Sequence, residues 1–392
     1  MSEDDKEFEE TLTLVSPEGK IKSPIKNCIN FIESAKKEFK IGDKPFVSGT
    51  DEESFPIAEK RIKRIPTCKD IRKVGFVDGG NAPLIKSADF NVSLNRVAGT
   101  IFRSSEFIPL QDMPEVVEFY SATILSPTKG GGMEFHTKFF PQNPEDKIYL
   151  PKKDIKISIS DESIRERGFL PRIERFGGIA RRFAEWSYAK ELIKRELDEK
   201  DIFVRDGSLQ TGYKDEILLA ERLYKKAKHK NVYVTGISKT CRLFTTRGDS
   251  LISAVDYIAS NKYPKERWYF HPIYKITKAD NQADLYFVKL HAQSDYPFRF
   301  DIYLEQSEKL DQQGRENIIS NIATTAQDLS FPGYPYGLIK VDQLSRVAFR
   351  ELDSYKVMLL SEFPQDIYEN FIVPRVHSVN AHDLINKVRI NR

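Results

Sequence analysis

The sequence predicts a mixed α/β fold, in which a central mixed sheet is flanked by helices, carries an insertion at one edge and is followed by a helical C-terminal part. Three observations support this fold class. Strand patterns come first, a long helical pattern follows them, and short strands then alternate with helices. The 392 residues, 40% hydrophobic and 30% charged, suffice for one large core or two smaller ones.

Residues 1–64 precede the strand patterns and are predicted to form an acidic tail and a helical segment. Residues 1–20 have the composition of a disordered chain, and NCINFIESAKKEF has apolar positions at helical spacing. The start, MSEDDKEFEE, is unlike a signal peptide, and no apolar run approaches the roughly 20 residues of a membrane span. Three cysteines without CxxC spacing argue against a structural zinc site. We therefore expect a cytoplasmic protein without membrane association.

Residues 65–392 carry the main domain. The expected strands are 73–78, 89–102, 117–125, 201–206, 232–237 and 268–276, with a hairpin over 284–304. The expected helices are 177–200, 214–229, 249–260, 312–328, 338–351 and a last segment near 380–388. A glycine-rich break, KGGGMEFHTKFF, and a proline-bearing stretch predict an insertion at about 105–160. Three leading strands, a helix and then alternating strands and helices are the element order of an RNase H-like sheet, although this order alone would fit several α/β folds.

Two aspartates occupy matching positions. Asp78 in KVGFVDGG and Asp206 in DIFVRDGSL each follow an apolar strand and precede glycine. The alternative for one such stretch alone is an ordinary Asp-Gly turn. If the two strands lie side by side, their carboxylates meet at the sheet rim and repel unless a cation separates them. Hard oxygen ligands in this arrangement suggest Mg²⁺ or Mn²⁺.

A third ligand is expected from the helix between the two strands. Its inward face centres near Ala189, and Glu185, four residues earlier, lies about 40° from that direction. Glu191 lies about 200° away and is expected to point to solvent, while Glu196 shares the inward face too far along the helix. Glu185 is therefore the favoured ligand, with a role at the helix dipole as the alternative.

Basic residues surround these positions. Residues 59–73 carry seven Lys/Arg against two acids, and residues 172–195 carry another seven Lys/Arg against three acids. Such clusters suit a phosphate backbone, although each alone also fits a solvated helix face. The candidate DNA contacts are Arg181, Arg182 and Lys239, and Lys239 in TGISKT could also touch the scissile phosphate as a point charge.

Seven segments in order resemble the NurA nuclease family: VDGG, SLNRVAGTIF, DGSL, GISKT, YFVKLHAQSDYPFRFDIYL, GYPYGLIKVDQLSRVA and VHSVNAHDLIN. They run from about residue 73 to 388. The resemblance implies an RNase H-like fold, a homodimer, a requirement for Mn²⁺ or Mg²⁺, and degradation of single- and double-stranded DNA by 5′-to-3′ exonuclease and single-strand endonuclease action. It also implies a partner, the hexameric ATPase HerA, in resection of DNA double-strand breaks.

By position, Asp78, Glu185 and Asp206 look like the family's metal-binding carboxylates, and His382 looks like its C-terminal active-site histidine, a metal ligand or a proton donor to the leaving group. Asp342 and Asp383 are left open as neighbours of the site or solvated residues. The expected chemistry is two-metal phosphodiester hydrolysis. Two alternatives stay open: a non-catalytic DNA-end scaffold for the ATPase, and a phosphotransferase of the sugar-kinase and actin type.

Overall fold

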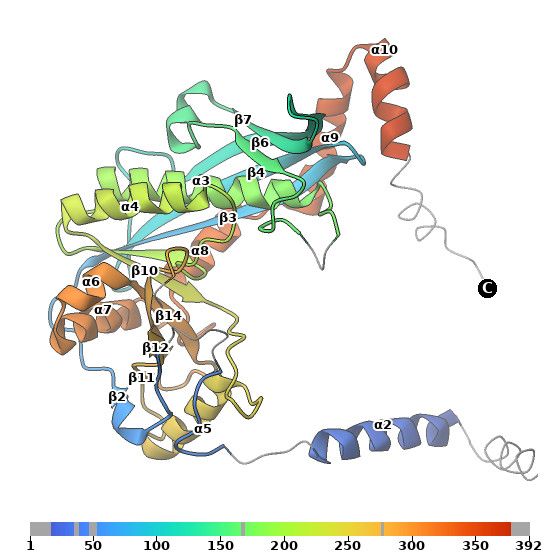
Figure 1. Cartoon of the computed structure of the whole chain (residues 1–392). Coiled ribbons are helices and arrows are strands. Elements are labelled where there is room, and N and C mark those ends of the chain that lie inside the picture. Colours follow the sequence, from blue (N-terminus) through green and yellow to red (C-terminus); the bar gives the residue numbers. More distant parts are fainter. Residues whose placement is uncertain (1–16, 35–38, 47–52, 166–168, 276–277, 378–392) are drawn as a thin grey trace, which may run out of the picture.

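The computed structural model describes residues 17–34, 39–46, 53–165, 169–275 and 278–377. These residues form a large mixed sheet with helices on both faces (Figure 1). Its strand order is β2-β11-β13-β14-β10-β9-β3-β4-β6-β7-β8, with β5 paired to β4, and β1 and β12 form a separate two-stranded sheet.

The strands are β1 (Glu53–Ser54), β2 (Ile62–Arg64), β3 (Lys73–Lys86), β4 (Phe90–Arg103), β5 (Glu106–Ile108), β6 (Val116–Pro127), β7 (Met133–Pro141), β8 (Ile155–Ser158), β9 (Ile202–Asp206), β10 (Tyr233–Ser238), β11 (Trp268–Phe270), β12 (Tyr274–Lys275), β13 (Ala283–Lys289) and β14 (Phe298–Tyr303). The helices are α2 (Pro17–Ser34), α3 (Arg175–Arg195), α4 (Glu216–Lys230), α5 (Leu251–Lys262), α6 (Leu304–Lys309), α7 (Gln312–Thr324), α8 (Tyr336–Ser345), α9 (Phe349–Ser361) and α10 (Gln365–Ile367), with short 3-10 turns η1 (Glu59–Arg61) and η2 (Pro144–Tyr149) and a π-helical turn η3 (Tyr368–Ile372).

The centre of the sheet has the predicted RNase H-like topology. β3, β4 and β6 form an antiparallel meander, and β9 and β10 continue the sheet parallel to β3. α3 connects the meander to β9, and α4 connects β9 to β10. The fold class expected from the element order is therefore confirmed.

The segment at about 105–160 belongs to this sheet. β6 pairs with β4, and β7 and β8 continue outward from β6 as edge strands. The glycines at 130–132 lie in the turn between β6 and β7, where an added Cβ at Gly130 would meet nothing within 4 Å. The glycine run is thus a hairpin turn at the edge.

Alternating side chains divide the sheet into two buried faces. On β3, Val77 belongs to the core beneath α3 and α4, whereas Val74 and Phe76 belong to the core beneath α7 and α8. β9 repeats this division, because Phe203 faces α3 and Val204 faces the α8 side. On these strands, odd-numbered residues therefore face α3 and even-numbered residues face α8.

Several expected element boundaries differ from the structure. β3 runs eight residues past its expected end, and the expected helix 338–351 is two helices, α8 and α9, of which α9 continues to Ser361. Residues 17–20, expected to be disordered, lie in α2, which extends away from the body of the molecule (Figure 1). The helix expected near 380–388 lies outside the described residues.

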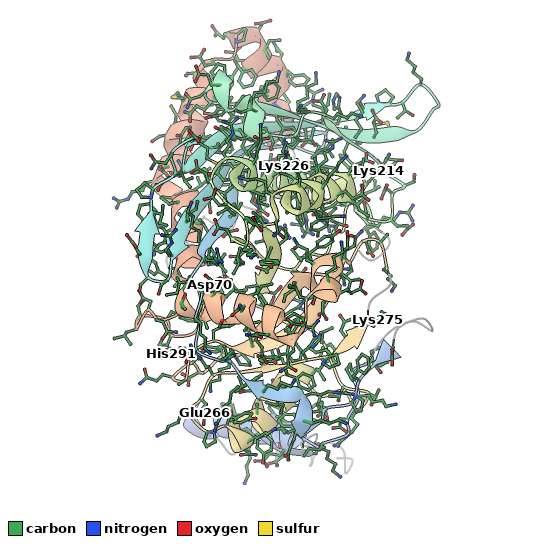
Figure 2. The ribbon with its side chains drawn as sticks, turned by 90° about the vertical axis from the view of Figure 1, so that its left-hand side faces the viewer. Asp70, Lys214, Lys226, Glu266, Lys275 and His291 are labelled. Carbon is green, nitrogen blue, oxygen red and sulfur yellow. The ribbon has the colours of Figure 1, made fainter. Side chains whose placement is uncertain are left out.

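α7 covers the sheet on the side opposite α3, because Ile318 and Ile322 share a core with Phe76 of β3. Figure 2 shows the molecule and its side chains from the left of Figure 1, with the orange helices α6 and α7 toward the viewer. Asn321 on α7 donates hydrogen bonds to the carbonyls of Asp70 and Asn317, and it accepts one from the amide of Arg72 just before β3. These bonds fix the start of β3 against α7. No helix in the described part of the chain is long and apolar enough to cross a membrane.

Candidate active site

Asp78 and Asp206 stand next to each other where the parallel pairing of β3 with β9 ends. β3 and β9 pair in register up to Val77 and Arg205, so the two aspartates are the next residue on each strand. Like Phe76 and Val204, both aspartates have even numbers on their strands, so their side chains belong to the face of the sheet that α8 covers. The sequence allows an Asp-Gly turn at Asp78, but β3 continues as a strand paired with β4. At Asp206 the chain does turn, through Gly207 with φ +105°, a conformation that favours glycine.

The two glycines after Asp78 let both helix layers reach the strand. A Cβ on Gly79 would lie 2.9 Å from Cγ of Arg181 and 2.9 Å from Oε1 of Glu185, both on α3. A Cβ on Gly80 would lie 2.2 Å from the carbonyl oxygen of Ser345 at the end of α8. The VDGG motif is therefore a point of close approach from both faces.

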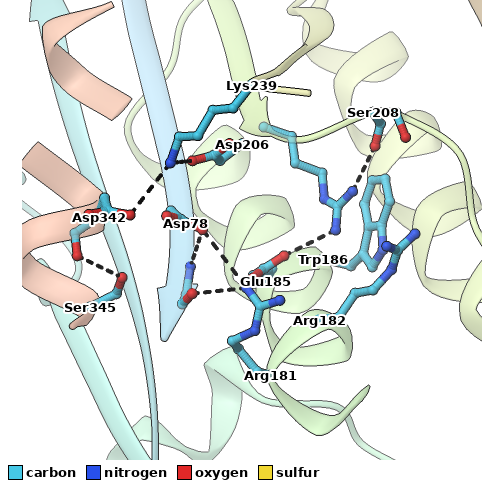
Figure 3. Close-up of polar contacts among 12 residues, drawn as sticks. Asp78, Arg181, Arg182, Glu185, Trp186, Asp206, Ser208, Lys239, Asp342 and Ser345 are labelled. Carbon is cyan, nitrogen blue, oxygen red and sulfur yellow. Dashed lines mark hydrogen bonds and ion pairs between the residues drawn. The ribbon is translucent and has the colours of Figure 1, made fainter. Parts of the chain in front are cut away.

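Glu185 reaches this point from α3. Its carboxylate is buried and pairs with Arg181 one turn earlier and with Arg205 of β9, whose Nη2 lies 3.0 Å from Oε2 of Glu185 (Figure 3). Arg181 also donates to the carbonyl of Gly79 and lies 3.9 Å from Oδ1 of Asp78. Arg205 is itself buried over the ring of Trp186. Glu185 thus lies beside Asp78, as the helix phase predicts.

Glu191 does not point to solvent, and this expectation is wrong. Its side chain is buried and ion-paired with Lys190, Lys194 and Arg195. The reason is that α3 is covered on more than one side, by the sheet, by α4 and by η2, where Arg195 lies over the ring of Tyr149. These three cations hold Glu191 toward the far end of α3, away from the aspartates.

Lys239 connects Asp206 to the opposite helix layer. It follows β10, which is the next parallel strand, and its Nζ lies 2.7 Å from Oδ2 of Asp206 and 3.4 Å from Oδ1 of Asp342 on α8 (Figure 3). The hydroxyl of Tyr334 donates to Asp206 at 3.4 Å. The structure therefore brings Asp342, left open by the sequence, to the edge of the cluster.

The three carboxylates repel one another. Burial, and then the charges of Asp206 and Glu185, raise the pKa of Asp78 from 3.8 to about 7, although the Gly79 amide and Arg181 oppose the shift. Burial lowers the pKa of Lys239, but the hydrogen bond to Asp206 and the charges of Asp206, Asp78 and Asp342 together outweigh it and raise that pKa above its ordinary value. The groups around Asp78 therefore do not fully offset the cost of burying its charge beside two other carboxylates.

The donor set fits a divalent cation. Among the described residues, no three acidic, histidine or cysteine side chains converge tightly enough to ligate an ion as they stand. Both oxygens of Glu185 are bonded to arginines, one to Arg181 and the other to Arg205. Carboxylate oxygens are nevertheless the ligands that Mg²⁺ and Mn²⁺ prefer, and a cation would relieve the repulsion that raises the pKa of Asp78.

Arg182, a predicted DNA contact, pairs with groups outside the carboxylate cluster, and its contact with DNA stays a prediction. Its guanidinium pairs with Glu216 at the start of α4 and bonds the carbonyl of Gln210. Glu216 is buried and also accepts a hydrogen bond from Trp186. Arg182 therefore fastens α3 to α4, whereas Arg181, one residue earlier, faces Glu185 and Asp78.

The sequence matches the NurA domain from residue 72 to residue 347, more than two thirds of the chain. The chain belongs to the NurA family. The matched NurA domain contains all the clustered residues, from Asp78 to Asp342, and ends before α9. Among curated proteins, none is significantly similar to this chain in sequence.

Solved structures with a similar arrangement are Argonaute and Piwi proteins. The A. aeolicus Argonaute matches 71% of the NurA chain with a TM-score of 0.29 and 10% identity, and the C-terminal lobe of a budding yeast Argonaute matches 75% with a TM-score of 0.31 and 10% identity. Drosophila Piwi matches 70% with a TM-score of 0.24 and 9% identity. The NurA chain spans 28%, 51% and 29% of these three proteins, respectively.

His382 lies outside the described residues of this NurA protein, and so does Asp383. Two other histidines pair with aspartates away from the cluster, His271 with Asp284 and His136 with Asp154. Tyr334 is not among the residues that the sequence singles out. The signal that could have found it is its position in GYPYG, two residues before a helix that carries Asp342.

Proposed function

We propose that this NurA-family chain is a divalent-metal-dependent deoxyribonuclease that hydrolyses phosphodiester bonds at the Asp78 cluster. The observation that carries the proposal is the convergence of Asp78 and Asp206 from parallel strands with Glu185 from the connecting helix. Such a concentration of buried negative charge is costly for stability, and its use in a nuclease is to hold cations against a phosphate. Family membership supports the same conclusion.

Asp78, Glu185 and Asp206 would hold the metal, Mn²⁺ or Mg²⁺, in a two-metal arrangement. When bound, such ions lower the pKa of a water molecule and stabilise the charge on the leaving oxygen. For Glu185 to take part, its carboxylate must exchange at least one of its arginine bonds. Arg181 would then be released toward the phosphate, which makes it a candidate DNA contact.

Lys239 is the second candidate contact. Its half-exposed ammonium lies between Asp206 and Asp342, where it can bind a phosphate oxygen of the bond to be cleaved. The Tyr334 hydroxyl, bonded to Asp206, keeps that carboxylate oriented. Asp342 is a candidate fourth acidic group of the site. We retain His382 as a proposed metal ligand or proton donor to the leaving group.

The finer properties implied by the family are part of the proposal. They are 5′-to-3′ exonuclease and single-strand endonuclease action, a homodimer, and association with a HerA-type hexameric ATPase at DNA double-strand breaks in the cytoplasm. A two-fold dimer would present a symmetric surface to a ring. The alternative, a non-catalytic DNA-end scaffold, does not explain why three carboxylates are buried side by side. The phosphotransferase alternative loses its glycine loop, because Gly130 lies in an edge hairpin.

The test is cleavage of labelled single- and double-stranded DNA with Mn²⁺, Mg²⁺ or EDTA, by the wild type and by Asp206→Asn. Asp206→Asn keeps the shape of the side chain and its acceptor for Lys239. We expect metal-dependent cleavage by the wild type, a loss of several orders of magnitude in the variant, and unchanged DNA binding in EDTA. Metal-independent cleavage, or full activity of Asp206→Asn, would refute the proposed site.

A further inference from the structure

A hollow of about 720 Å³ adjoins the carboxylate cluster on the α8 side. Lys239, which is bonded to Asp206, lines the hollow. The other lining residues are 296–298 before and at the start of β14, Ser330, Phe331 and Tyr334, and Ile339, Asp342 and Arg346 on and just after α8. The volume lies within the range of about 300–1,000 Å³ typical of small-ligand sites. The proposed catalytic function uses Lys239, Tyr334 and Asp342 but leaves the rest of the hollow without a role.

Aromatic rings stand on the wall of this hollow without being core residues. Tyr296 and Phe331 stack with parallel, offset rings, with centroids 5.9 Å apart and an interplanar angle of 5°. The two side chains are nonetheless 58% and 41% exposed. Phe331 in turn meets the edge of Tyr334, with centroids 6.1 Å apart, and Tyr334 packs on the buried Phe298. The outer pair therefore presents flat apolar surface on a rigid support.

Cations border the same hollow. The Nζ of Lys239 lies 5.6 Å from the ring centroid of Tyr334, and the exposed guanidinium of Arg346 is held at 2.6 Å from Asp342. Flat apolar walls beside two cations match a ligand with a planar ring at one end and a phosphate at the other. An apolar peptide would match the rings but not the two cations.

We propose that this hollow binds the nucleobase of an unpaired nucleotide next to the phosphodiester being cleaved, stacked on Tyr296 and Phe331. The proposal rests on the proposed nuclease function, because Lys239 places the phosphate. A base inside a duplex is already stacked on its neighbours, so only an unpaired base can enter. The hollow thus selects single-stranded or frayed DNA at the bond to be cleaved, and Tyr296 and Phe331 determine that preference.

The test compares cleavage of single-stranded oligonucleotides that differ only in one abasic residue, moved stepwise along the strand. For the wild type, cleavage at the bond beside the abasic residue should be slower than in the intact strand by about 5- to 100-fold, the range for losing one base–aromatic stack. In Tyr296→Ala this ratio should fall to about 1. Tyr296→Phe keeps the ring and should restore the wild-type ratio.

Tyr257→Ala is the matched control, because Tyr257 on α5 is similarly exposed, at 56%, and does not line the hollow. It should keep the wild-type ratio. A wild-type ratio of about 1 at every position, or an equal ratio in the wild type and Tyr296→Ala, would overturn the proposal.

A binding measurement separates this proposal from the nuclease function. Single-stranded DNA carrying 2-aminopurine is titrated with each protein in EDTA, where no cleavage is expected. If the wild type quenches the fluorescence and Tyr296→Ala does not, the base site stands even when the wild type cleaves no DNA, and only the nuclease function fails. Quenching that is the same in both proteins, or absent in both, overturns the base site.

Discussion

Replacing Asp78 with asparagine is expected to abolish cleavage and yet make the cation-free protein more stable. Asparagine keeps the size of the side chain and can still accept the hydrogen bond from the Gly79 amide, which is 2.7 Å from Oδ1 of Asp78. What disappears is a charge on a side chain only 12% exposed that faces Asp206 and Glu185. In the absence of a cation, removing this charge removes repulsion as well as a desolvation cost.

The size of the effect depends on the pKa of Asp78. Burial and the two neighbouring carboxylates raise it from 3.8 to about 7 in the folded protein. Between these two pH values the folded state binds more protons than the unfolded state, so the wild type loses stability as the pH rises through this window. About three pKa units at about 1.4 kcal/mol each set an upper limit of about 4 kcal/mol above pH 7. Below pH 4 the difference between the two proteins should vanish.

The measurement is urea unfolding in EDTA between pH 4 and pH 8, evaluated as the difference between Asp78→Asn and the wild type. Mn²⁺ should then stabilise the wild type by mass action and leave Asp78→Asn unaffected. An Asp78→Asn protein less stable than the wild type at pH 8 in EDTA would refute the reasoning. So would a difference that does not change with pH.

Asp284→Asn is the matched control of opposite sign. Asp284 is also largely buried, with 19% of its side chain exposed. Burial alone would raise its pKa, but hydrogen bonds from His271, Ser307 and Tyr286 lower it below 3.8. A lowered carboxylate pKa contributes stability above pH 3.8 that is lost as the pH falls through the folded value. Asp284→Asn should therefore be less stable than the wild type at neutral pH.

Two further predictions concern the neighbours of Asp78, and a third concerns the assembly. Glu185→Gln should lose cleavage and also roughly 3–5 kcal/mol of stability, because Arg205 is then left buried without its charged partner. Glu191→Gln should lose stability but keep the wild-type initial cleavage rate at each Mn²⁺ concentration. An inactive Glu191→Gln with an active Glu185→Gln would mean that the wrong glutamate was chosen. Gly80→Ala should displace α8, which should lower the free energy of unfolding by about 1–3 kcal/mol and remove most of the activity. Gly130→Ala, where the added methyl group enters open space, should change stability by less than about 0.5 kcal/mol. Light scattering at micromolar concentration should give the mass of a dimer, and a monomer would contradict the proposed assembly.

The sequence by itself determined the elements that depend on local patterns. A short apolar run identifies β9 up to Asp206, and helical spacing identifies α3 and the inward direction of Glu185. The order of these elements leaves few topologies, since a parallel partner for β3 requires a crossover such as α3. The pair of strand-end aspartates could therefore be found without coordinates.

Only the tertiary structure decided which polar groups meet. Glu191 lies on what the periodicity marks as the outer face of α3, yet it is buried among Lys190, Lys194 and Arg195. Arg195 in turn lies over Tyr149 of η2, from a distant part of the chain. Arg182 and Arg181 are adjacent in sequence, yet one fastens α4 and the other faces Asp78. Asp342 joins the site because Gly80 lets the end of α8 approach β3. Helical periodicity identifies the face of one helix that packs on the sheet. The contacts of the other faces depend on segments that are distant in the sequence.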